Sequence, residues 1–216
     1  MALACDPDLL IMDEPTTGLD VTTEATILDL VVDLKHRVNA GILYVSHNLG
    51  AVARVADRVA VMYAGQTIEQ APVGDLFKNP KHPYTAGLLQ CVPQSPSDTG
   101  TVTKLRSIPG GIYTPGETTA QACLFAPRCP IAQESCRTNA PEMFEAGDNH
   151  HSRCFFQGDV PEWKAPDQRL LRHAIPEDRL RVYDIRKVID LLADEGSVVE
   201  LRREFGVGIV TAFARI

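Results

Sequence analysis

Apolar residues in the first ninety positions alternate between continuous runs and helical spacing. Residues 9–12 and 42–46 are short apolar runs, which are typical of buried strands. From Thr23 to Val38 the apolar side chains recur every three or four residues, with Asp20 or Thr22 available to cap a helix there. A strand, a helix and a strand joined over this distance predict parallel pairing through a right-handed crossover.

The same patterns divide the chain into three segments, residues 1–92, 93–165 and 166–216. The further regular elements expected are a helix over 48–55, strands over 58–63 and 67–70 joined by the turn Ala64-Gly65, a helix over 183–193, and strands over 197–201 and 208–216. The middle segment is rich in Pro, Gly, Ser and Thr and contains four cysteines, so loops ordered by a ligand or metal are predicted there.

Composition narrows the possible function classes. The 216 residues carry a formal charge of −7 with no dense run of Lys and Arg, which argues against a general nucleic-acid-binding protein. No stretch approaches the roughly 20 apolar residues of a membrane span, and the first residues lack the basic start of a secretory signal. We therefore expect a cytosolic protein, in which clustered cysteines indicate metal binding before disulfides.

Acidic and imidazole side chains follow the two predicted buried strands. Asp13 and Glu14 come directly after the first strand, and Ser46 and His47 end the second. The carboxyl ends of parallel neighbours meet at one edge of a sheet, where ligands bind in such folds. An Asp at that edge can hold Mg²⁺, a Glu can orient or deprotonate a water, and a His can hydrogen-bond a phosphate. Two alternatives stay open from these residues alone: the acid pair caps a turn, and the histidine is structural.

The full strings are far more specific than the single residues. LLIMDEPTTGLD followed by ILYVSHNLGAVARVADRVAVMYAGQTIE closely resembles the ATPase subunit of ABC transporters, and GDLFKNPKHPYTAGLLQCVP resembles the oligopeptide and dipeptide importer branch. The resemblance spans residues 1 to about 157. It implies an α/β fold, with part of a P-loop NTPase parallel sheet and its helices followed by a loop-rich extension that contains the cysteines. Asn48 departs from the aspartate common in that branch, a change expected to matter little.

The resemblance also implies roles for the site residues. Asp13 matches the Walker B aspartate, which organises Mg²⁺ in the family, and Glu14 matches the catalytic glutamate. His47 matches the switch histidine, which senses the terminal phosphate of ATP.

Further candidate nucleotide-binding residues follow from the same comparison. Gly18 and Asp20 match the D-loop, which communicates across a subunit interface, and Ser46 precedes the switch histidine. The family binds ATP and Mg²⁺ and pairs with a second ATPase subunit and with transmembrane permease subunits. We therefore expect a peripheral protein on the inner face of the cell membrane.

The phosphate-binding half of that machinery has no counterpart in the sequence. Neither GxxxxGK[ST] nor LSGGQ occurs, although both precede the Walker B strand in the family. The chain therefore resembles the carboxyl-terminal half of such a subunit, and we expect that alone it neither binds ATP tightly nor hydrolyses it. The family's strand that leads into the phosphate loop is taken to lie beside the Walker B strand. An unpaired edge, with marginal stability or self-association, is therefore expected.

The cysteines of the middle segment are Cys123, Cys129, Cys136 and Cys154. Four thiolates can complete a metal shell, although this spacing is not that of a zinc ribbon. The same pattern occurs in the importer family's extension and implies a [4Fe–4S] cluster, while free thiols in a loop are the alternative. His150 and His151 are expected to be solvated neighbours, and Cys5 and Cys91 to be small core residues.

The last segment resembles a different family. IPE, YDIRKVID, GSVVEL and GIVTAFARI occur in this order and resemble carboxyltransferase subunits of biotin-dependent acyl-CoA carboxylases, which have a crotonase-like fold. Such enzymes hold an enolate with paired backbone N–H groups from glycine-rich loops, and no such loop follows here, so we assign no catalytic residue. An accidental tail of a helix and strands is the alternative.

The leading hypothesis is therefore a truncated ATP-binding subunit of a peptide importer, whose full-length form couples ATP hydrolysis to transport. Whether this chain is itself an enzyme stays open. The competing hypotheses are a non-catalytic Fe–S or metal-binding module and an acyl-CoA carboxyltransferase fragment. Nucleotide binding, metal content and acyl-CoA binding distinguish the three.

Overall fold

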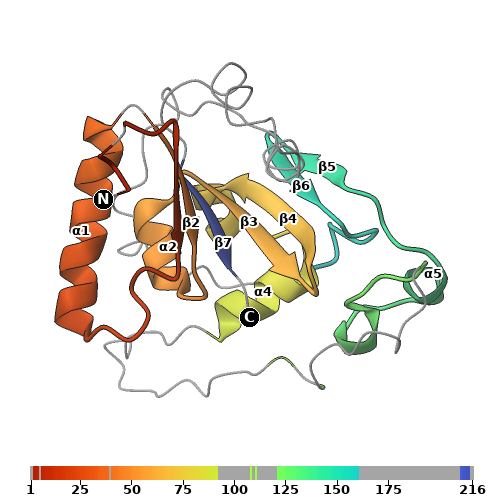
Figure 1. The fold of residues 1–216 in the computed structure, drawn as a ribbon. Coiled ribbons are helices and arrows are strands. Elements are labelled where there is room, and N and C mark those ends of the chain that lie inside the picture. The colour runs from red at the N-terminus through yellow and green to blue at the C-terminus, as the bar shows by residue number, and fades with distance from the viewer. Residues whose placement is uncertain are drawn as a thin grey trace. The chain divides into compact units, whose positions relative to one another are not determined.

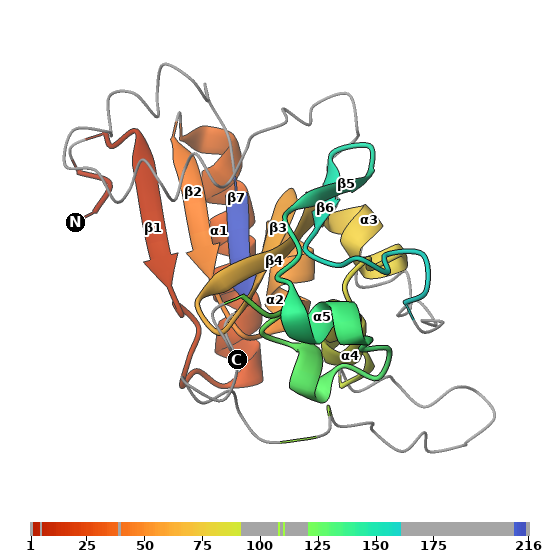
Figure 2. The ribbon, with the colours of Figure 1, turned by 90° about the vertical axis from the view of Figure 1, so that its right-hand side faces the viewer.

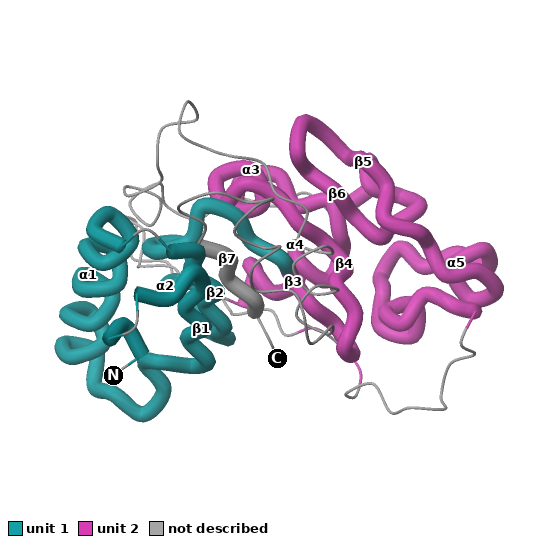
Figure 3. The backbone as a smooth tube through the Cα atoms, turned by 45° about the horizontal axis from the view of Figure 1, so that its top comes forward, with its two compact units in different colours: residues 1–60, 172–215 teal, residues 61–171, 216 magenta. Residues whose placement is uncertain are grey.

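The computed structural model describes residues 2–4, 6–38, 40–91, 108, 110, 121–160 and 210–214. These residues form a mixed α/β fold (Figure 1). Backbone contacts divide the chain into two compact units, residues 1–60 with 172–215 and residues 61–171 with 216, hereafter unit 1 and unit 2 (Figure 3).

Unit 1 is built on parallel strands. β1 (Leu9–Asp13), β2 (Gly41–Val45) and β7 (Val210–Ala214) lie side by side, with β2 in the middle (Figure 2). The register runs from Leu9↔Gly41 to Asp13↔Val45 between β1 and β2, and from Ile42↔Val210 to Val45↔Phe213 between β2 and β7. The first two predicted strands and their parallel pairing are confirmed, and β7 falls within the strand expected over 208–216.

Two helices cover one face of these strands (Figures 1 and 2). α1 (Val21–Arg37) begins after Asp20, whose carboxylate accepts hydrogen bonds from two backbone N–H groups of the first turn. Asp20 is thus the expected N-cap. α2 (Leu49–Val55) begins after Asn48, whose side-chain oxygen caps it in the same way. Both predicted helices are therefore present, each held at its start by a side chain that satisfies otherwise unpaired N–H groups.

The apolar pattern predicted burial at two positions that the structure exposes. Ile11 of β1 is 53% exposed, and Leu30 of α1 is 57% exposed. Leu30 lies on the side of the helix opposite Leu28, which is buried, since residues two apart are separated by about 200°. Among the described strands, β1 stands at the end of the strand order, which is where the open edge was expected.

A buried ion pair ties α1 to the segment that precedes β3 (Arg58–Tyr63). Lys35 Nζ lies 2.5 Å from Asp57 Oδ1, and each side chain is only 9% exposed. Burial lowers the pKa of Lys35, and the attraction of Asp57 opposes that shift. Because a buried charge depends on its partner, removing one member of such a pair is far more costly than breaking a surface pair.

Unit 2 begins within β3. The turn Ala64-Gly65, with φ of 49° and 79°, leads from β3 into β4 (Gln66–Pro72) as the sequence predicted. The remaining elements are α3 (Val73–Lys78), α4 (Pro83–Gln90), the short 3₁₀ helix η1 (Ala126–Arg128), α5 (Glu134–Thr138), β5 (Phe144–Gly147) and β6 (His150–Ser152). β6 pairs antiparallel with both β4 and β5. The cysteine-containing segment therefore adds strands to β4, where the sequence pattern had predicted mainly loops.

A buried carboxylate anchors this segment to β4. Glu69 is fully buried and accepts hydrogen bonds from the backbone N–H groups of Lys81 (2.5 Å) and His82 (3.0 Å). Its Oε1 also lies 2.7 Å from Nε2 of His150, which is 4% exposed. The expectation that His150 is solvated is therefore wrong, because its ring is buried as the hydrogen-bonding partner of the Glu69 carboxylate. Cys91 is half-buried at the end of α4 rather than in the core.

Several predicted features lie outside the described residues. They are the helix over 183–193, the strand over 197–201 and Cys5. Within the described ranges, no helix combines the length and the apolar character that a membrane crossing requires.

Candidate functional site

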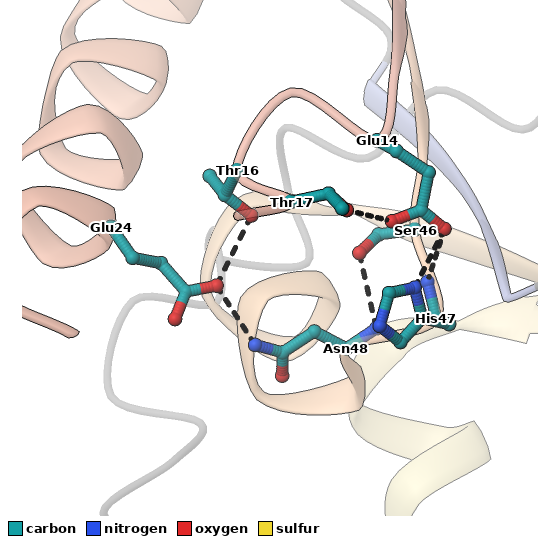
Figure 4. A network of polar contacts seen from close by, with 7 residues as sticks. All are labelled: Glu14, Thr16, Thr17, Glu24, Ser46, His47 and Asn48. Atoms are coloured by element: carbon teal, nitrogen blue, oxygen red, sulfur yellow. Dashed lines mark hydrogen bonds and ion pairs between the residues drawn. The ribbon is translucent and has the colours of Figure 1, made fainter. Parts of the chain in front are cut away.

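The carboxyl ends of β1 and β2 meet in one polar site of unit 1 (Figure 4). The backbone N–H of Glu14 donates to the carbonyl oxygen of Val45 over 2.9 Å, so the ladder continues one residue beyond β1. Glu14 has a φ of 49°, in the left-handed region that residues other than glycine rarely adopt. This turn brings the Glu14 carboxylate to the loop that follows β2.

Glu14 and His47 are in direct contact at this site. Glu14 Oε1 lies 2.8 Å from Nδ1 of His47 and accepts the backbone N–H of His47 over 3.2 Å. Oε2 accepts the hydroxyl of Thr17 over 2.6 Å. The Thr17 hydroxyl, followed by the His47 contacts, holds the pKa of Glu14 below its ordinary value, although partial burial acts in the other direction. The carboxylate is therefore ionised at neutral pH and oriented from two sides.

A second hydrogen-bonded group lies beside this pair and was missed by the sequence analysis (Figure 4). Glu24 of α1 accepts the hydroxyl of Thr16 over 3.1 Å and the side-chain amide of Asn48 over 2.9 Å. We name Thr16, Glu24 and Asn48 the glutamate clasp, because it joins the turn after β1, the start of α1 and the start of α2. Asn48 could have been expected as a helix cap from its position before an apolar helix. No local pattern marks Glu24 as its partner.

The other predicted nucleotide-site residues have different surroundings. Asp13 is exposed at the end of β1, and Gly18 has a φ of 82° with open space where a Cβ would stand. Asp20 is engaged as the cap of α1, and the Thr23 hydroxyl that it accepts over 2.7 Å is the main reason why its pKa is lowered. Ser46 is buried, and its Oγ accepts the backbone N–H of Asn48. The structure thus joins Glu14 to His47 and leaves Asp13 open to solvent.

The four predicted ligand cysteines line one pocket of unit 2, together with apolar side chains such as Phe125. Cys136 and Cys154 are buried, and the backbone N–H of Cys123 donates to the carbonyl oxygen of Cys136 over 2.9 Å. Within the described residues, no three His, Cys, Asp or Glu side chains stand close enough together to hold a single metal ion. The thiols therefore surround a shared space without forming a mononuclear site.

Burial disfavours the thiolate form of three of these thiols, Cys123, Cys129 and Cys154. Burial, reinforced by the neighbouring cysteines, raises the pKa of Cys129 to about 11 and of Cys154 to about 12. Burial also raises the pKa of Cys123.

Two family models match different parts of the chain. Residues 68–136 match the oligopeptide/dipeptide transporter, C-terminal region, and residues 148–216 match the carboxyl transferase domain. Most of the second match lies outside the described residues.

Curated relatives match a longer part of the chain. The oligopeptide transport ATP-binding protein AppD of Bacillus subtilis is 48% identical over 155 residues, which are 72% of this chain and 46% of AppD. A putative peptide import ATP-binding protein of Brucella ovis is 48% identical over 158 residues, 71% of this chain and 46% of that protein. The oligopeptide transport ATP-binding protein OppD of Lactococcus lactis subsp. cremoris is 45% identical over 174 residues, 79% of this chain and 49% of OppD.

The homologues are thus ATP-binding proteins of peptide ABC transporters. The chain spans about half the length of these curated relatives. Together with the family match over 68–136, these relatives show that the chain is similar to the carboxyl-terminal region of an oligopeptide or dipeptide transporter ATP-binding subunit. A partial importer subunit fits these findings.

Proposed function

We propose that the Glu14–His47 site is the hydrolytic edge of an ATP-binding subunit of a peptide importer. The observation that carries this proposal is the 2.8 Å contact between Glu14 Oε1 and His47 Nδ1 at the ends of two parallel strands. An ionised carboxylate held beside an imidazole can orient a water and register a phosphate at one place. The relatives at 45–48% identity carry ATP-binding and peptide transport in their names.

Each residue has a distinct role in this proposal. Glu14 accepts a proton from the attacking water or polarises it, and Thr17 keeps the carboxylate ionised and aimed. His47 donates a hydrogen bond to the terminal phosphate from its solvent-exposed ring. Asp13 is an exposed carboxylate at the strand end and is suited to hold Mg²⁺, which would neutralise phosphate charge.

The other candidate residues have supporting roles in this proposal, and the phosphate-binding loop would come from another part of the full-length protein. Gly18 and Asp20 lie on the turn that would face a second ATPase subunit, and Ser46 supports the loop that carries His47. The sequence contains no GxxxxGK[ST] cradle, so we propose that this chain alone neither binds ATP tightly nor hydrolyses it. In the full-length protein, hydrolysis would drive permease subunits from a peripheral position on the cytoplasmic face of the membrane.

A chimera tests this proposal directly. The matching region of the Bacillus subtilis relative is replaced by residues 6–160 of this chain, and ATP hydrolysis by the purified chimera is measured. We expect activity that Glu14→Gln lowers by at least about 100-fold, which is typical for loss of a positioned acid or base. Glu142→Gln, which changes an exposed glutamate in the same way, is the matched control. An active chimera that keeps its rate with Glu14→Gln would refute the role of Glu14.

The cysteine pocket supports a second proposal, that the described extension binds a metal cluster. The four thiols that line it, Cys123, Cys129, Cys136 and Cys154, match the ligand chemistry of iron–sulfur proteins. A cluster of several irons occupies more space than one ion, so its ligands stand farther apart. This is consistent with thiols that share a pocket but form no mononuclear site. The cluster would supply a cross-link between η1, α5 and the segment after β6.

Metal analysis of anaerobically purified protein tests the second proposal. We expect on the order of four irons per chain together with acid-labile sulfide, as in a [4Fe–4S] protein. Cys129→Ser should abolish this content, whereas Cys91→Ser should preserve it, because Cys91 does not line the pocket. Zinc in place of iron would contradict the cluster, and protein free of any metal would contradict metal binding altogether.

A further inference from the structure

β2 needs a hydrogen-bonding neighbour on each side. Its central residues Ile42, Leu43 and Tyr44 are 2%, 7% and 0% exposed, so both faces of the strand are buried. Backbone N–H and C=O groups in such a setting are costly to leave unpaired, because water cannot reach them. β1 pairs with one side of β2, and the backbone groups on the other side need a second neighbouring strand.

That edge is filled by β7, which is far from β2 in the sequence. Four consecutive residue pairs join the two strands in parallel, from Ile42↔Val210 to Val45↔Phe213. β7 belongs to the stretch that matches the carboxyl transferase domain, whereas β2 lies outside that match. A strand that matches a separate family thus completes this sheet. Such pairing depends on main-chain hydrogen bonds, as in the recognition of peptides by strand addition.

The connection to β7 is long enough to allow exchange between molecules. The 49 residues 161–209 separate β7 from the preceding described segment. A chain of that length can reach up to roughly 160 Å when extended, several times the width of a small domain. A strand delivered by such a connection can pair within its own chain or with a second copy.

We propose that the β2 edge opposite β1 is a strand-acceptor site whose ligand is the segment Val210–Ala214. The segment fills the site of its own chain in the monomer and the site of a second copy when the chain is concentrated, which produces a strand-exchanged dimer. The chemistry of the ligand is that of an extended parallel strand. Val, Thr and Phe favour the extended conformation. A proline within the segment would remove a backbone N–H donor from the hydrogen-bond ladder.

Hydrogen exchange on the unmodified chain tests the pairing without any substitution. Among residues 211–214, the alternate amides that donate to β2 should exchange at least about tenfold more slowly than in an unfolded chain, since ladder hydrogen bonds protect them. The amides of β2 should be protected together with them. Exchange of residues 211–214 at the unfolded-chain rate would overturn the proposal.

A proline variant and a peptide test the acceptor site itself. Ala212→Pro should empty the site, and a fluorescent peptide of residues 208–216 should then bind this variant at least about tenfold more tightly than the unmodified chain. The same peptide with proline at position 212 is the control and should not bind. Equal binding of the normal peptide to both proteins, or binding of the proline peptide, would contradict a strand-acceptor site.

The oligomeric state tests the exchange between copies. Light scattering should show that the dimer fraction of the unmodified chain rises with concentration and that Ala212→Pro abolishes this dimer. A chain that stays monomeric at every concentration would overturn exchange. A dimer that persists in Ala212→Pro would overturn it as well, because such a dimer would use another surface, such as the open edge of β1.

Discussion

Asn48→Asp is the substitution that best tests the glutamate clasp. The change replaces an amide by a carboxylate of the same shape, and both groups can cap α2 equally well. It removes, however, the donor that Asn48 Nδ2 offers to Glu24 Oε1 over 2.9 Å, and places a second acid against the first. The sequence comparison predicted that this position matters little, whereas the structure predicts a clear loss of stability.

The size of the loss follows from two contributions. The lost hydrogen bond costs roughly 0.5–1.5 kcal/mol. Two carboxylates about 3 Å apart repel by about 5 kcal/mol at an effective dielectric constant of 20, and by about half of this once the side chains rotate to about 6 Å. Rotation and solvent reduce the repulsion further because Glu24 and Asn48 are only half-buried. We therefore expect the free energy of unfolding to fall by about 2 kcal/mol.

Urea unfolding at pH 7 measures this difference, and a double-mutant cycle assigns it. In Glu24→Gln combined with Asn48→Asp, the new amide can donate to the new carboxylate, so the pair is restored with its polarity reversed. The double variant should therefore be more stable than the sum of the single effects predicts by about 1 kcal/mol or more.

Two outcomes would contradict the clasp. One is an Asn48→Asp variant as stable as the unmodified chain, and the other is strict additivity of the two substitutions. A lower pH gives an internal check, since protonation of either carboxylate removes the repulsion. The destabilisation should therefore be smaller in acid solution than at pH 7.

Three further predictions concern single side chains. His82 caps α4, since its Nδ1 accepts the backbone N–H of Tyr84 over 3.1 Å, and burial lowers its pKa to about 3 from an ordinary 6.5. Between pH 6.5 and about 3 the unfolded chain therefore binds a proton that the folded chain does not, and the free energy of unfolding should fall by about 1.4 kcal/mol for each unit by which the pH is lowered. Urea unfolding of His82→Asn, which keeps a cap acceptor, should show a smaller dependence on pH, and an unchanged dependence would contradict this assignment. Thr17→Val should raise the pKa of Glu14, because that hydroxyl is the main cause of its lowered value; a carboxyl NMR titration that shows no change would contradict this assignment. Lys35→Met should cost about 3 kcal/mol in thermal or urea unfolding, whereas Arg37→Met, at an exposed pair, should cost less than about 1 kcal/mol; equal costs would refute the importance of burial.

Local patterns predicted most of the elements that position the site. The apolar runs at 9–12 and 42–46 became β1 and β2, and Asp20, one of the two cap candidates, became the cap of α1. These features depend on residues within a few positions of one another, since a strand or a cap is decided by side-chain periodicity and by one polar group at a helix start. The topology of a parallel crossover then sufficed to predict that Glu14 and His47 meet.

The contacts that lack a local pattern could not be predicted in this way. Glu24 joins Asn48 from 24 residues away, and Glu69 joins His150 from 81 residues away. Each acid resembles an ordinary surface residue in the sequence, because charged side chains are buried only when a distant partner is supplied. The same reason explains why His150 was expected in solvent.

The amino-acid sequence by itself determined the succession of strands and helices, the acidic and imidazole residues at the strand ends, and the four cysteines of the extension. Tertiary structure alone decided that a glutamate clasp supports the loop of His47 and that β7 pairs with β2. Apolar periodicity and helix capping depend on residues within a few positions of one another, so they can be read from the sequence. The choice of partners across dozens of residues is made by burial, which penalises every polar group and strand edge that folding leaves unsatisfied.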